Sequence, residues 1–274
     1  MRLGSYELHL LSDGYFTLDP GAYYGIVPRP IWSRYAAEDA AGRVKLALRV
    51  PLLVGNEYSI LVDSGIGKPQ NQKLASIYEV DKSTDIGSAI ENYTSRQNIR
   101  YIVHSHLHFD HSGHSLLESP QGRELPNATL VAQSSEFRAY WRPNEFTRSS
   151  YWRNDSVMKK SKKLQLEGSA RIAPGIRAVK TGGHTSGHQV IIAGGEGKEM
   201  IYFGDLIPSA FHVRVPYVTA IDSFPLETIK MKRLLIRKAI RDGAICIFNH
   251  DPVTPSGILH GDVEKPQIEA VSID

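Results

Sequence analysis

The sequence predicts one layered α/β domain in which strands bring histidine and aspartate side chains to a common edge. Its 274 residues are 41% hydrophobic and 22% charged, enough for one large core. β-type runs occur together with amphipathic helical stretches, as in layered α/β domains. Several runs are followed directly by a potential ligand, namely His106, His184, Asp205 and His250. No linker or internal repeat divides the chain, so residues 1–274 are expected to form a single domain.

The first third of the chain predicts strands joined by turns. Residues 7–18 predict short strands around Asp13 and Gly14, a pair that favours a hairpin turn. Residues 21–35 are rich in glycine, proline and aromatic residues and are expected to form a loop. Residues 44–54 alternate as a strand does, and residues 58–62 predict its return strand.

The rest of the chain predicts further strands and three helices. Residues 85–93 have helical spacing, and Ser134 is a suitable N-cap for a helix through Tyr140. Residues 226–241 carry an apolar stripe that ends before Gly243, a residue suited to closing a helix. β-type runs occupy residues 99–103, 129–132, 176–179, 189–193, 200–203 and 244–248. The last run contains the only cysteine, Cys246, which is expected to be a buried strand residue.

The composition excludes several classes of protein. One cysteine permits neither an intramolecular disulfide nor a thiolate metal cluster. Residues 1–20 do not resemble a secretory signal, and no run of about 18 apolar residues predicts a membrane span. A cytoplasmic protein without membrane contact is therefore expected. The net charge is only +3, and the lysine-rich residues 159–163 are interpreted as a solvated face rather than a nucleic-acid site.

Four potential metal ligands lie close together, in the order His106-x-His108-x-Asp110-His111. Alternate side chains of an extended segment face the same way, so His106 and His108 are suited to sharing one metal ion. A turn after Phe109 would direct Asp110 and His111 towards a neighbouring position. Imidazole and carboxylate ligands without thiolate suit Zn²⁺, Fe²⁺ or Mn²⁺. The spacing therefore predicts a metal site rather than a polar loop with chance histidines.

Five segments together resemble the motifs of the metallo-β-lactamase superfamily. The first is the HxHxDH segment from His106 to His111. The others are Asp63-Ser64-Gly65, Gly183-His184-Thr185-Ser186-Gly187-His188, Phe203-Gly204-Asp205 and His250-Asp251-Pro252. The resemblance extends over most of the chain and implies a four-layer αββα sandwich with metal ions at one edge.

The resemblance also implies which residues bind two divalent ions, with Zn²⁺ as the expected metal. The ligands of the first ion would be His106, His108 and His184. Those of the second would be Asp110, His111 and His250, with Asp205 as the bridge. This assignment leaves His104, His114 and His188 for packing or for hydrogen bonds around the ligands, with His188 bonding loop backbone. Asp63 is either an acceptor for a ligand histidine or part of a plain turn after a strand.

Two such ions would lower the pKa of a shared water, so the expected reaction is attack of a metal-bridging hydroxide on an electrophilic carbon or phosphorus. Asp110 is the candidate catalytic residue, which would orient the nucleophile or pass a proton to the leaving group. Within the superfamily, residues 205–212 and 249–252 are most similar to quorum-quenching lactonases and their organophosphate-hydrolysing relatives. The opening of a lactone or the cleavage of a related ester is therefore expected.

One position departs from the lactonase pattern. The well-known acyl-homoserine lactonases have a tyrosine three residues after the bridging aspartate, where its phenol aids the substrate carbonyl, and Pro208 stands here instead. Either His212 or Tyr217 binds substrate in place of this tyrosine, or the substrate is not an acyl-homoserine lactone. A surface position is the alternative for His212.

Two aromatic-rich stretches, residues 23–35 and 137–152, are candidates for a pocket that binds an apolar acyl or aryl group of a small-molecule substrate. The same rings would equally serve to pack loops onto the sandwich or to form a homodimer contact.

Other reactions within the same fold remain alternatives. They are a mononuclear iron dioxygenase, a thioester hydrolase and an organophosphate triester hydrolase. His108 argues against a diiron oxidoreductase, which tends to carry a carboxylate there. A non-catalytic binding protein is disfavoured because all seven potential ligands are present.

Overall fold

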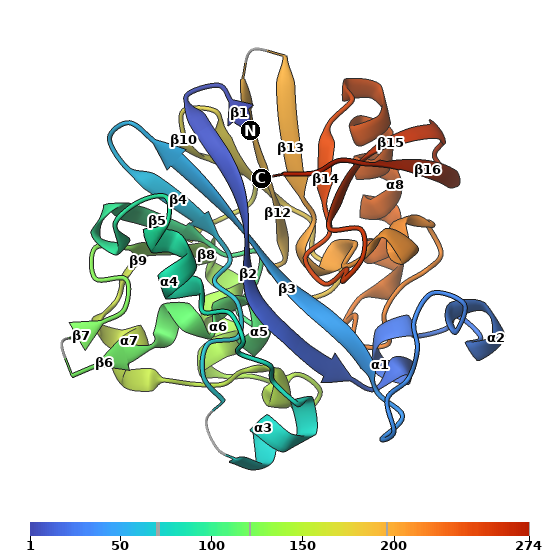
Figure 1. Cartoon of the computed structure of the whole chain (residues 1–274), viewed down its shortest axis with the longest axis horizontal. Helices are drawn as coiled ribbons and strands as arrows, with labels where there is room; N and C mark the ends of the chain where they lie inside the picture. The colour runs from blue at the N-terminus through green and yellow to red at the C-terminus, as the bar shows by residue number, and fades with distance from the viewer. Residues whose placement is uncertain (70–71, 121, 196, 274) are drawn as a thin grey trace.

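The computed structural model describes residues 1–69, 72–120, 122–195 and 197–273, which form two facing seven-stranded sheets (Figure 1). The first sheet contains, in spatial order, β1 (Arg2–Leu3), β2 (Tyr6–Leu18), β3 (Val44–Gly55), β4 (Ser59–Val62), β5 (Ile99–Val103), β8 (Thr129–Gln133) and β9 (Lys162–Leu166). The second contains β10 (Ala170–Ala173), β11 (Ile176–Lys180), β12 (Gln189–Gly195), β13 (Lys198–Tyr202), β14 (Ile245–Ile247), β15 (Ser256–Asp262) and β16 (Lys265–Ala270). A separate pair consists of β6 (Glu118–Ser119) and β7 (Gly122–Arg123).

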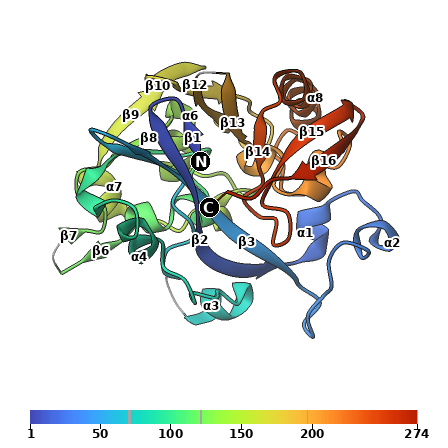
Figure 2. The ribbon, with the colours of Figure 1, turned by 45° about the horizontal axis from the view of Figure 1, so that its top comes forward.

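Helices lie outside both sheets. The α-helices are α1 (Pro20–Tyr24), α2 (Arg29–Trp32), α3 (Gln72–Tyr78), α4 (Ile86–Glu91), α5 (Phe109–Ser112), α6 (Ser134–Trp141), α7 (Asp155–Lys160) and α8 (Pro225–Asp242). Short 3-10 turns occupy Arg96–Asn98, His114–Leu116, Arg148–Ser150, Gly204–Leu206 and Ala210–Val213. Two views place α4 and α7 beside the first sheet and α8 beside the second (Figures 1 and 2). In the part of the chain that the structure describes, no helix is both long and apolar enough to cross a bilayer.

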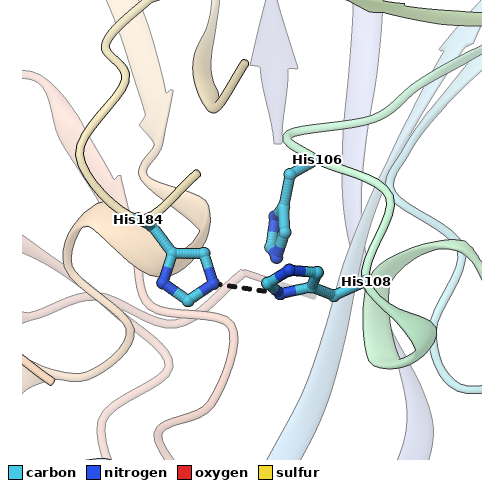
Figure 3. A group of neighbouring side chains, drawn as sticks. All are labelled: His106, His108 and His184. Atoms are coloured by element: carbon cyan, nitrogen blue, oxygen red, sulfur yellow. Dashed lines mark hydrogen bonds between the residues drawn. The ribbon is translucent and has the colours of Figure 1, made fainter. Parts of the chain in front are cut away.

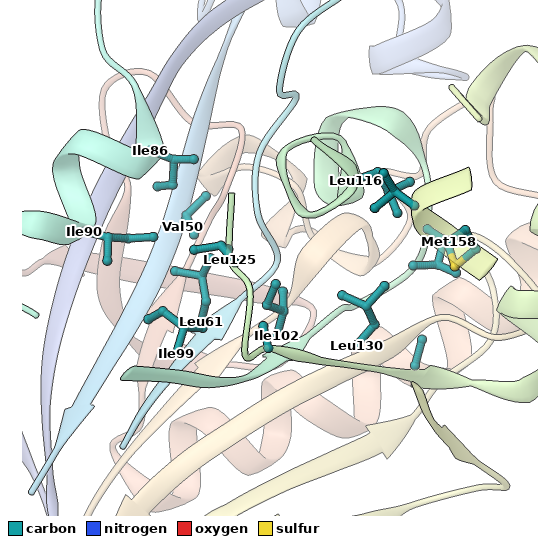
Figure 4. Close-up of a cluster of buried hydrophobic side chains, with 14 of the residues drawn as sticks. Val50, Leu61, Ile86, Ile90, Ile99, Ile102, Leu116, Leu125, Leu130 and Met158 are labelled. Atoms are coloured by element: carbon teal, nitrogen blue, oxygen red, sulfur yellow. The ribbon is translucent and has the colours of Figure 1, made fainter. Parts of the chain in front are cut away.

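Apolar cores between and outside the sheets hold these four layers together. Between the sheets, side chains such as Leu8, Val103 and Ile191 are fully buried. Outside the first sheet, its strands pack against α4, α6 and α7 through residues that include Ile90 and Met158 (Figure 4). Outside the second sheet, the apolar stripe of α8 packs on β12, β13 and β14. The order helix, sheet, sheet, helix confirms the predicted αββα sandwich.

Parallel pairing brings the ends of distant strands to one edge. In the first sheet β4, β5, β8 and β9 run parallel, and in the second β13 runs parallel to β14. Asp63 follows β4 directly, the histidine segment follows β5, and His250 lies close after β14. Parallel strands end on the same side of a sheet, so these segments gather there.

The predicted hairpin at Asp13 and Gly14 is wrong, because residues 6–18 form the single strand β2. The pairing with β3 shifts register between Ser12 and Tyr15, so these residues form a bulge. Asp13 is fully buried, and its Oδ2 accepts a 2.8 Å hydrogen bond from the Ile66 backbone N–H. Asp13 therefore fixes the loop after β4 instead of turning the chain.

The loop predicted for residues 21–35 is also partly wrong, because α1 and α2 lie within this stretch. Asp19 caps α1 by accepting hydrogen bonds from the backbone N–H groups of Gly21, at 2.7 Å, and Ala22, at 3.2 Å. Pro20 and Pro30 occupy the first turns of the two helices, where proline costs no backbone hydrogen bond.

Most other predicted elements are confirmed. The helix expected at residues 85–93 is α4, and the helix expected at 226–241 is α8, which Gly243 closes in the left-handed conformation at φ 58°. Cys246 is a buried residue of β14, as expected. The lysine run at residues 159–163 spans the end of α7 and the start of β9.

Candidate metal centre

Segments from both sheets supply the seven predicted ligands. The loop after β5 carries His106 and His108, of which His108 has an extended backbone, and α5 then begins at Phe109. This helix is the turn that the sequence predicted, and it brings Asp110 and His111 to the neighbouring group. The second sheet supplies His184, Asp205 and His250 from the segments that precede β12 and follow β13 and β14.

Three histidines converge to form the first trio, which consists of His106, His108 and His184 (Figure 3). The His184 Nε2 and His108 Nδ1 atoms lie 3.1 Å apart. The ring centroid of His106 is 4.4 Å from that of His108 and 4.7 Å from that of His184. All three side chains are buried, so their nitrogen atoms share a small space that is shielded from water.

The remaining ligands form the second group, which consists of Asp110, His111, Asp205 and His250. His250 Nε2 lies 3.3 Å from Asp110 Oδ2, and His111 Nε2 lies 3.7 Å from the same oxygen. In each of the two groups, one potential ligand atom per residue lies within 4.8 Å of all the others.

Asp205 lies between the trio and the second group. Its Oδ2 is 3.3 Å from His184 Nε2 and 3.9 Å from His106 Nε2. Its Oδ1 is 3.1 Å from His111 Nε2 and 3.2 Å from His250 Nε2. Each oxygen of one carboxylate thus faces a different group, which is the arrangement of a bridging ligand.

Hydrogen bonds fix which nitrogen of most histidines faces the centre. The Nδ1 atom of His184 bonds Asp222 Oδ1 at 2.9 Å, and that of His111 bonds Asp63 Oδ2 at 2.7 Å. The Nδ1–H of His250 donates to the Ala47 carbonyl at 2.8 Å. An imidazole that donates from Nδ1 presents the lone pair of Nε2, which is the form that binds a metal.

The donor set fits divalent cations. Inside the site, the buried Nε2 atom of His106 has no hydrogen-bond partner among the described residues, and His108 Nδ1 faces another imidazole nitrogen, His184 Nε2, at 3.1 Å. Buried polar atoms without suitable partners are costly, and a cation among these nitrogens would satisfy several at once. Five imidazoles and two carboxylates match the ligand preferences of Zn²⁺, Fe²⁺ and Mn²⁺.

The pKa shifts of the site's histidines differ in direction. Burial and the neighbouring histidines lower the pKa of His108 to about 3, and they hold the pKa of His106 well below its usual range. Burial opposes protonation of His250 as well, but Asp205 and Asp110 outweigh it and raise the pKa of His250 to about 9. Burial would raise the pKa of Asp205, whereas His111, His250 and His184 hold it well below its usual range. His106 and His108 are therefore held in the neutral form. Burial opposes protonation of His184 as well, but Asp205 and Asp222 outweigh it and raise the pKa of His184.

Asp63 is an acceptor for His111, one of the candidate ligands, and not merely a turn residue. Besides His111, its carboxylate accepts hydrogen bonds from the Ser105 backbone N–H at 2.6 Å, the Ser105 hydroxyl at 2.7 Å and the Tyr202 hydroxyl at 2.7 Å. Its backbone adopts a φ of 57°, which aspartate tolerates better than most residues. One carboxylate thus joins the ends of β4, β5 and β13.

The other histidines stay outside both groups. His104 is buried, and its Nε2 lies 3.2 Å from the Ser115 hydroxyl. His188 was expected to bond loop backbone, but its Nδ1 lies 2.7 Å from the Thr181 hydroxyl. His114 is buried, and neither of its ring nitrogens has a hydrogen-bond partner among the described residues.

The structure contradicts the prediction that His212 binds substrate and the alternative that it lies at the surface. Its side chain is fully buried, with Nδ1 2.7 Å from the Ser209 hydroxyl and Nε2 3.0 Å from the Tyr23 carbonyl. Both nitrogens are therefore used to hold two loops together. Tyr217 is half-buried and lines a cavity of about 460 Å³. Asp251, which follows His250 in the chain, lines the same cavity.

The aromatic stretches divide between packing and the region beside the ligands. Phe137 and Tyr140 belong to the core under α6, and Tyr24 stacks on Trp32 at 4.9 Å. Trp152 stacks on Phe109, with ring centroids 4.3 Å apart. In the sequence, Phe109 lies between the potential ligands His108 and Asp110. Loop packing therefore explains many of these rings, while Trp152 remains beside the site.

The sequence gives no signal for several groups that position ligands. Asp222 lies 38 residues from the histidine it bonds, and Glu136 lies on α6, where it contacts both loops of the trio. Isolated acidic residues form no motif, so only their burial identifies them. Glu136 is fully buried and Asp222 nearly so.

Comparison with known proteins agrees with this geometry. An N-acyl homoserine lactonase from Bacillus sp. is 23% identical over 86% of this chain and 85% of its own length. The lactonase AttM from Rhizobium radiobacter is 26% identical over 57% of this chain and 59% of its own length.

Solved structures share the fold. A probable metal-dependent hydrolase from Staphylococcus aureus is 28% identical, covers 99% of both chains and has a TM-score of 0.89. AidC, a dizinc quorum-quenching lactonase, has a TM-score of 0.73 at 18% identity over 99% of this chain and 96% of its own. The family model of the metallo-β-lactamase superfamily matches residues 51–250. The chain therefore belongs to the metallo-β-lactamase superfamily.

Proposed function

We propose that the protein is a dinuclear metal-dependent hydrolase that opens lactones or cleaves related esters. The observation that carries this proposal is the position of Asp205, whose two oxygens face the trio and the second group separately. The lactonase activity of relatives at 22–26% identity supports a lactone or ester as substrate.

The chain's own residues would divide the work of hydrolysis. The trio and the second group would hold two divalent ions, most simply Zn²⁺, which supply a nucleophile at neutral pH and polarise the substrate carbonyl. Asp110 is the least buried of the seven potential ligands, which supports a role for its carboxylate in taking a proton or passing one to the leaving oxygen. Ser105, Asp222 and the Ala47 carbonyl keep the ligand histidines in fixed orientations.

An apolar acyl or aryl group fits the surroundings of the ligands. Trp152 and Phe109 stack beside Asp110, and Tyr78 packs on Phe109 with centroids 4.8 Å apart. Tyr217 remains the proposed substrate contact in place of the tyrosine that Pro208 replaces. A second copy of the chain as partner also remains a proposal.

A substrate panel with metal analysis tests the proposal. Purified protein is loaded with Zn²⁺, Mn²⁺ or Fe²⁺, and its hydrolysis of acyl-homoserine lactones, simple lactones, aryl esters, thioesters and phosphotriesters is measured. We expect two metal ions per chain and the fastest turnover on a lactone or ester. One iron per chain with thiol-dependent oxygen uptake would instead identify a dioxygenase.

A further inference from the structure

Glu136 on α6 connects the two loops that carry the trio. Its Oε2 accepts a 3.0 Å hydrogen bond from the backbone N–H of Leu107, which lies between His106 and His108. Its Oε1 accepts a 2.5 Å hydrogen bond from the Thr185 hydroxyl and a 3.2 Å bond from the Gly187 backbone N–H. Thr185 directly follows His184 in the second loop, and Gly187 lies two residues further along it.

Glu136 and the buried face of the helix that carries it lie in the protein core. Glu136 is fully buried, and its neighbours Phe137 and Tyr140 hold α6 in the core outside the first sheet. Gly187 approaches the helix so closely that an added Cβ would lie 2.7 Å from Glu136 Oε1 and 2.5 Å from the Ser135 hydroxyl. The loop thus reaches the carboxylate because this position lacks a side chain.

The contacts of Glu136 are confined to the trio's side of the centre. The second group is held by other acceptors, namely Asp63 for His111 and the Ala47 carbonyl for His250. A buried carboxylate with three donors fixes the relative position of two loops more firmly than apolar packing does.

We infer that Glu136 is a positioning residue that sets the spacing of His106, His108 and His184, and so controls the affinity of the first metal site alone. It contacts no ligand atom itself and acts through the backbone of the two loops. This inference rests on the proposed metal centre, but it makes a separate claim about which site depends on Glu136.

Zinc affinity in two single-site backgrounds tests the inference. His250→Ala weakens the second group and leaves the trio, whereas His108→Ala leaves the second group. In each background, zinc affinity is measured by competition with a chromophoric chelator, with and without Glu136→Ala. Removing a group that orients metal ligands typically costs about 10–100-fold in affinity. We expect that loss in the His250→Ala background and a change of less than about threefold in the other.

Further variants control for indirect effects. Glu136→Gln keeps one acceptor oxygen and is expected to restore part of the affinity. Glu167→Gln changes a carboxylate that accepts from Ser134 at the start of the same helix but touches neither loop, and should leave both affinities unchanged. If the Glu136→Ala chain does not fold, Thr185→Val removes a single donor and should weaken zinc binding several-fold in the trio background only.

Equal losses in the two backgrounds, or no loss in either, would overturn the role of Glu136. Wild-type protein that binds no zinc would contradict the metal centre itself. The two failures are thus distinguished by the wild-type titration.

Discussion

The Nε2 atom of His184 lies 3.1 Å from the Nδ1 atom of His108, although 76 positions separate the two residues in the chain. The Nδ1 atom of His184 is already engaged by Asp222. If His184 donates its proton there, its Nε2 lone pair faces His108. Two lone pairs at such a distance repel each other unless a proton or a cation lies between them, and this relationship underlies the predictions for the centre.

Loss of the Asp205 carboxylate, the proposed bridge, should abolish metal binding at both groups. We expect Asp205→Asn to fold but to lose metal and hydrolysis together, and His106→Ala to fold but to lose hydrolysis and the metal of the trio. Metal content by mass spectrometry, circular dichroism and lactone hydrolysis measure the three properties. Unchanged turnover in either variant would overturn the assignment of the ligands.

Loss of the Asp63 carboxylate should destabilise the metal-free fold. Asp63→Ala leaves the buried donors of Ser105, His111 and Tyr202 without their acceptor. A cost of at least about 3 kcal/mol is expected in urea unfolding. Asp242→Ala removes an exposed ion-pair partner of Lys238 and Arg241 and serves as the control, with little change expected. Equal stabilities of the two variants would contradict the structural role of Asp63.

A side chain at Gly204, which precedes Asp205, should disturb the bridge. Gly204 has a φ of +52°, and an added Cβ would lie 2.7 Å from the Ser105 Cβ and 2.9 Å from His188 Nε2. Gly204→Ala is expected to cost more than about 2 kcal/mol in unfolding and to weaken zinc binding.

Gly168→Ala is the matched control for this variant. Gly168 also has a positive φ, of +86°, but an added Cβ there meets nothing within 4 Å. Its cost in unfolding should therefore be limited to backbone strain of about 1 kcal/mol. The difference between the two variants in free energy of unfolding measures the steric cost of the contacts at Gly204. A difference near zero would show that the close approach at Gly204 does not destabilise the variant.

Lys232 should make stability depend on pH. Its side chain is fully buried in α8 and donates to the Arg214 carbonyl at 2.9 Å, and burial lowers its pKa from 10.5 to about 7, although the charge of Asp222 opposes the shift. Between these values the unfolded chain binds a proton that the folded chain does not. The free energy of unfolding should therefore rise with pH through this window, by at most about 1.4 kcal/mol per unit.

Urea unfolding at pH 7 and pH 9 checks this effect. In Lys232→Met the titrating group is absent, so the rise with pH should be smaller than in the wild type by about 2 kcal/mol. The comparison removes the contribution of the other titrating groups, which both proteins share. Parallel pH profiles would show that Lys232 keeps an ordinary pKa.

The motifs predicted the sandwich and the approach of the seven potential ligands, because the ligand types occur at short, ordered spacings. The same reasoning failed for Asp13, where a pair typical of hairpin turns lies in the bulge of β2. It also failed for His212, because a histidine in a loop gives no indication of its burial. Glu136 and Asp222 were missed because their partners lie 29 or more positions away in the chain and form no motif with them.

The seven potential ligands come from segments next to both sheets, so the candidate centre lies between the two sheets. His106 and His111 follow β5 of the first sheet, while His184 precedes β12 and His250 follows β14 of the second. Ions bound there would connect the two sheets, so metal binding would be thermodynamically linked to folding. At a free metal concentration 100 times the dissociation constant, one site would add about 2.7 kcal/mol to the resistance to unfolding. The same atoms that prepare the chemistry would thus hold the domain closed, and a chelator would act on this protein as a mild denaturant.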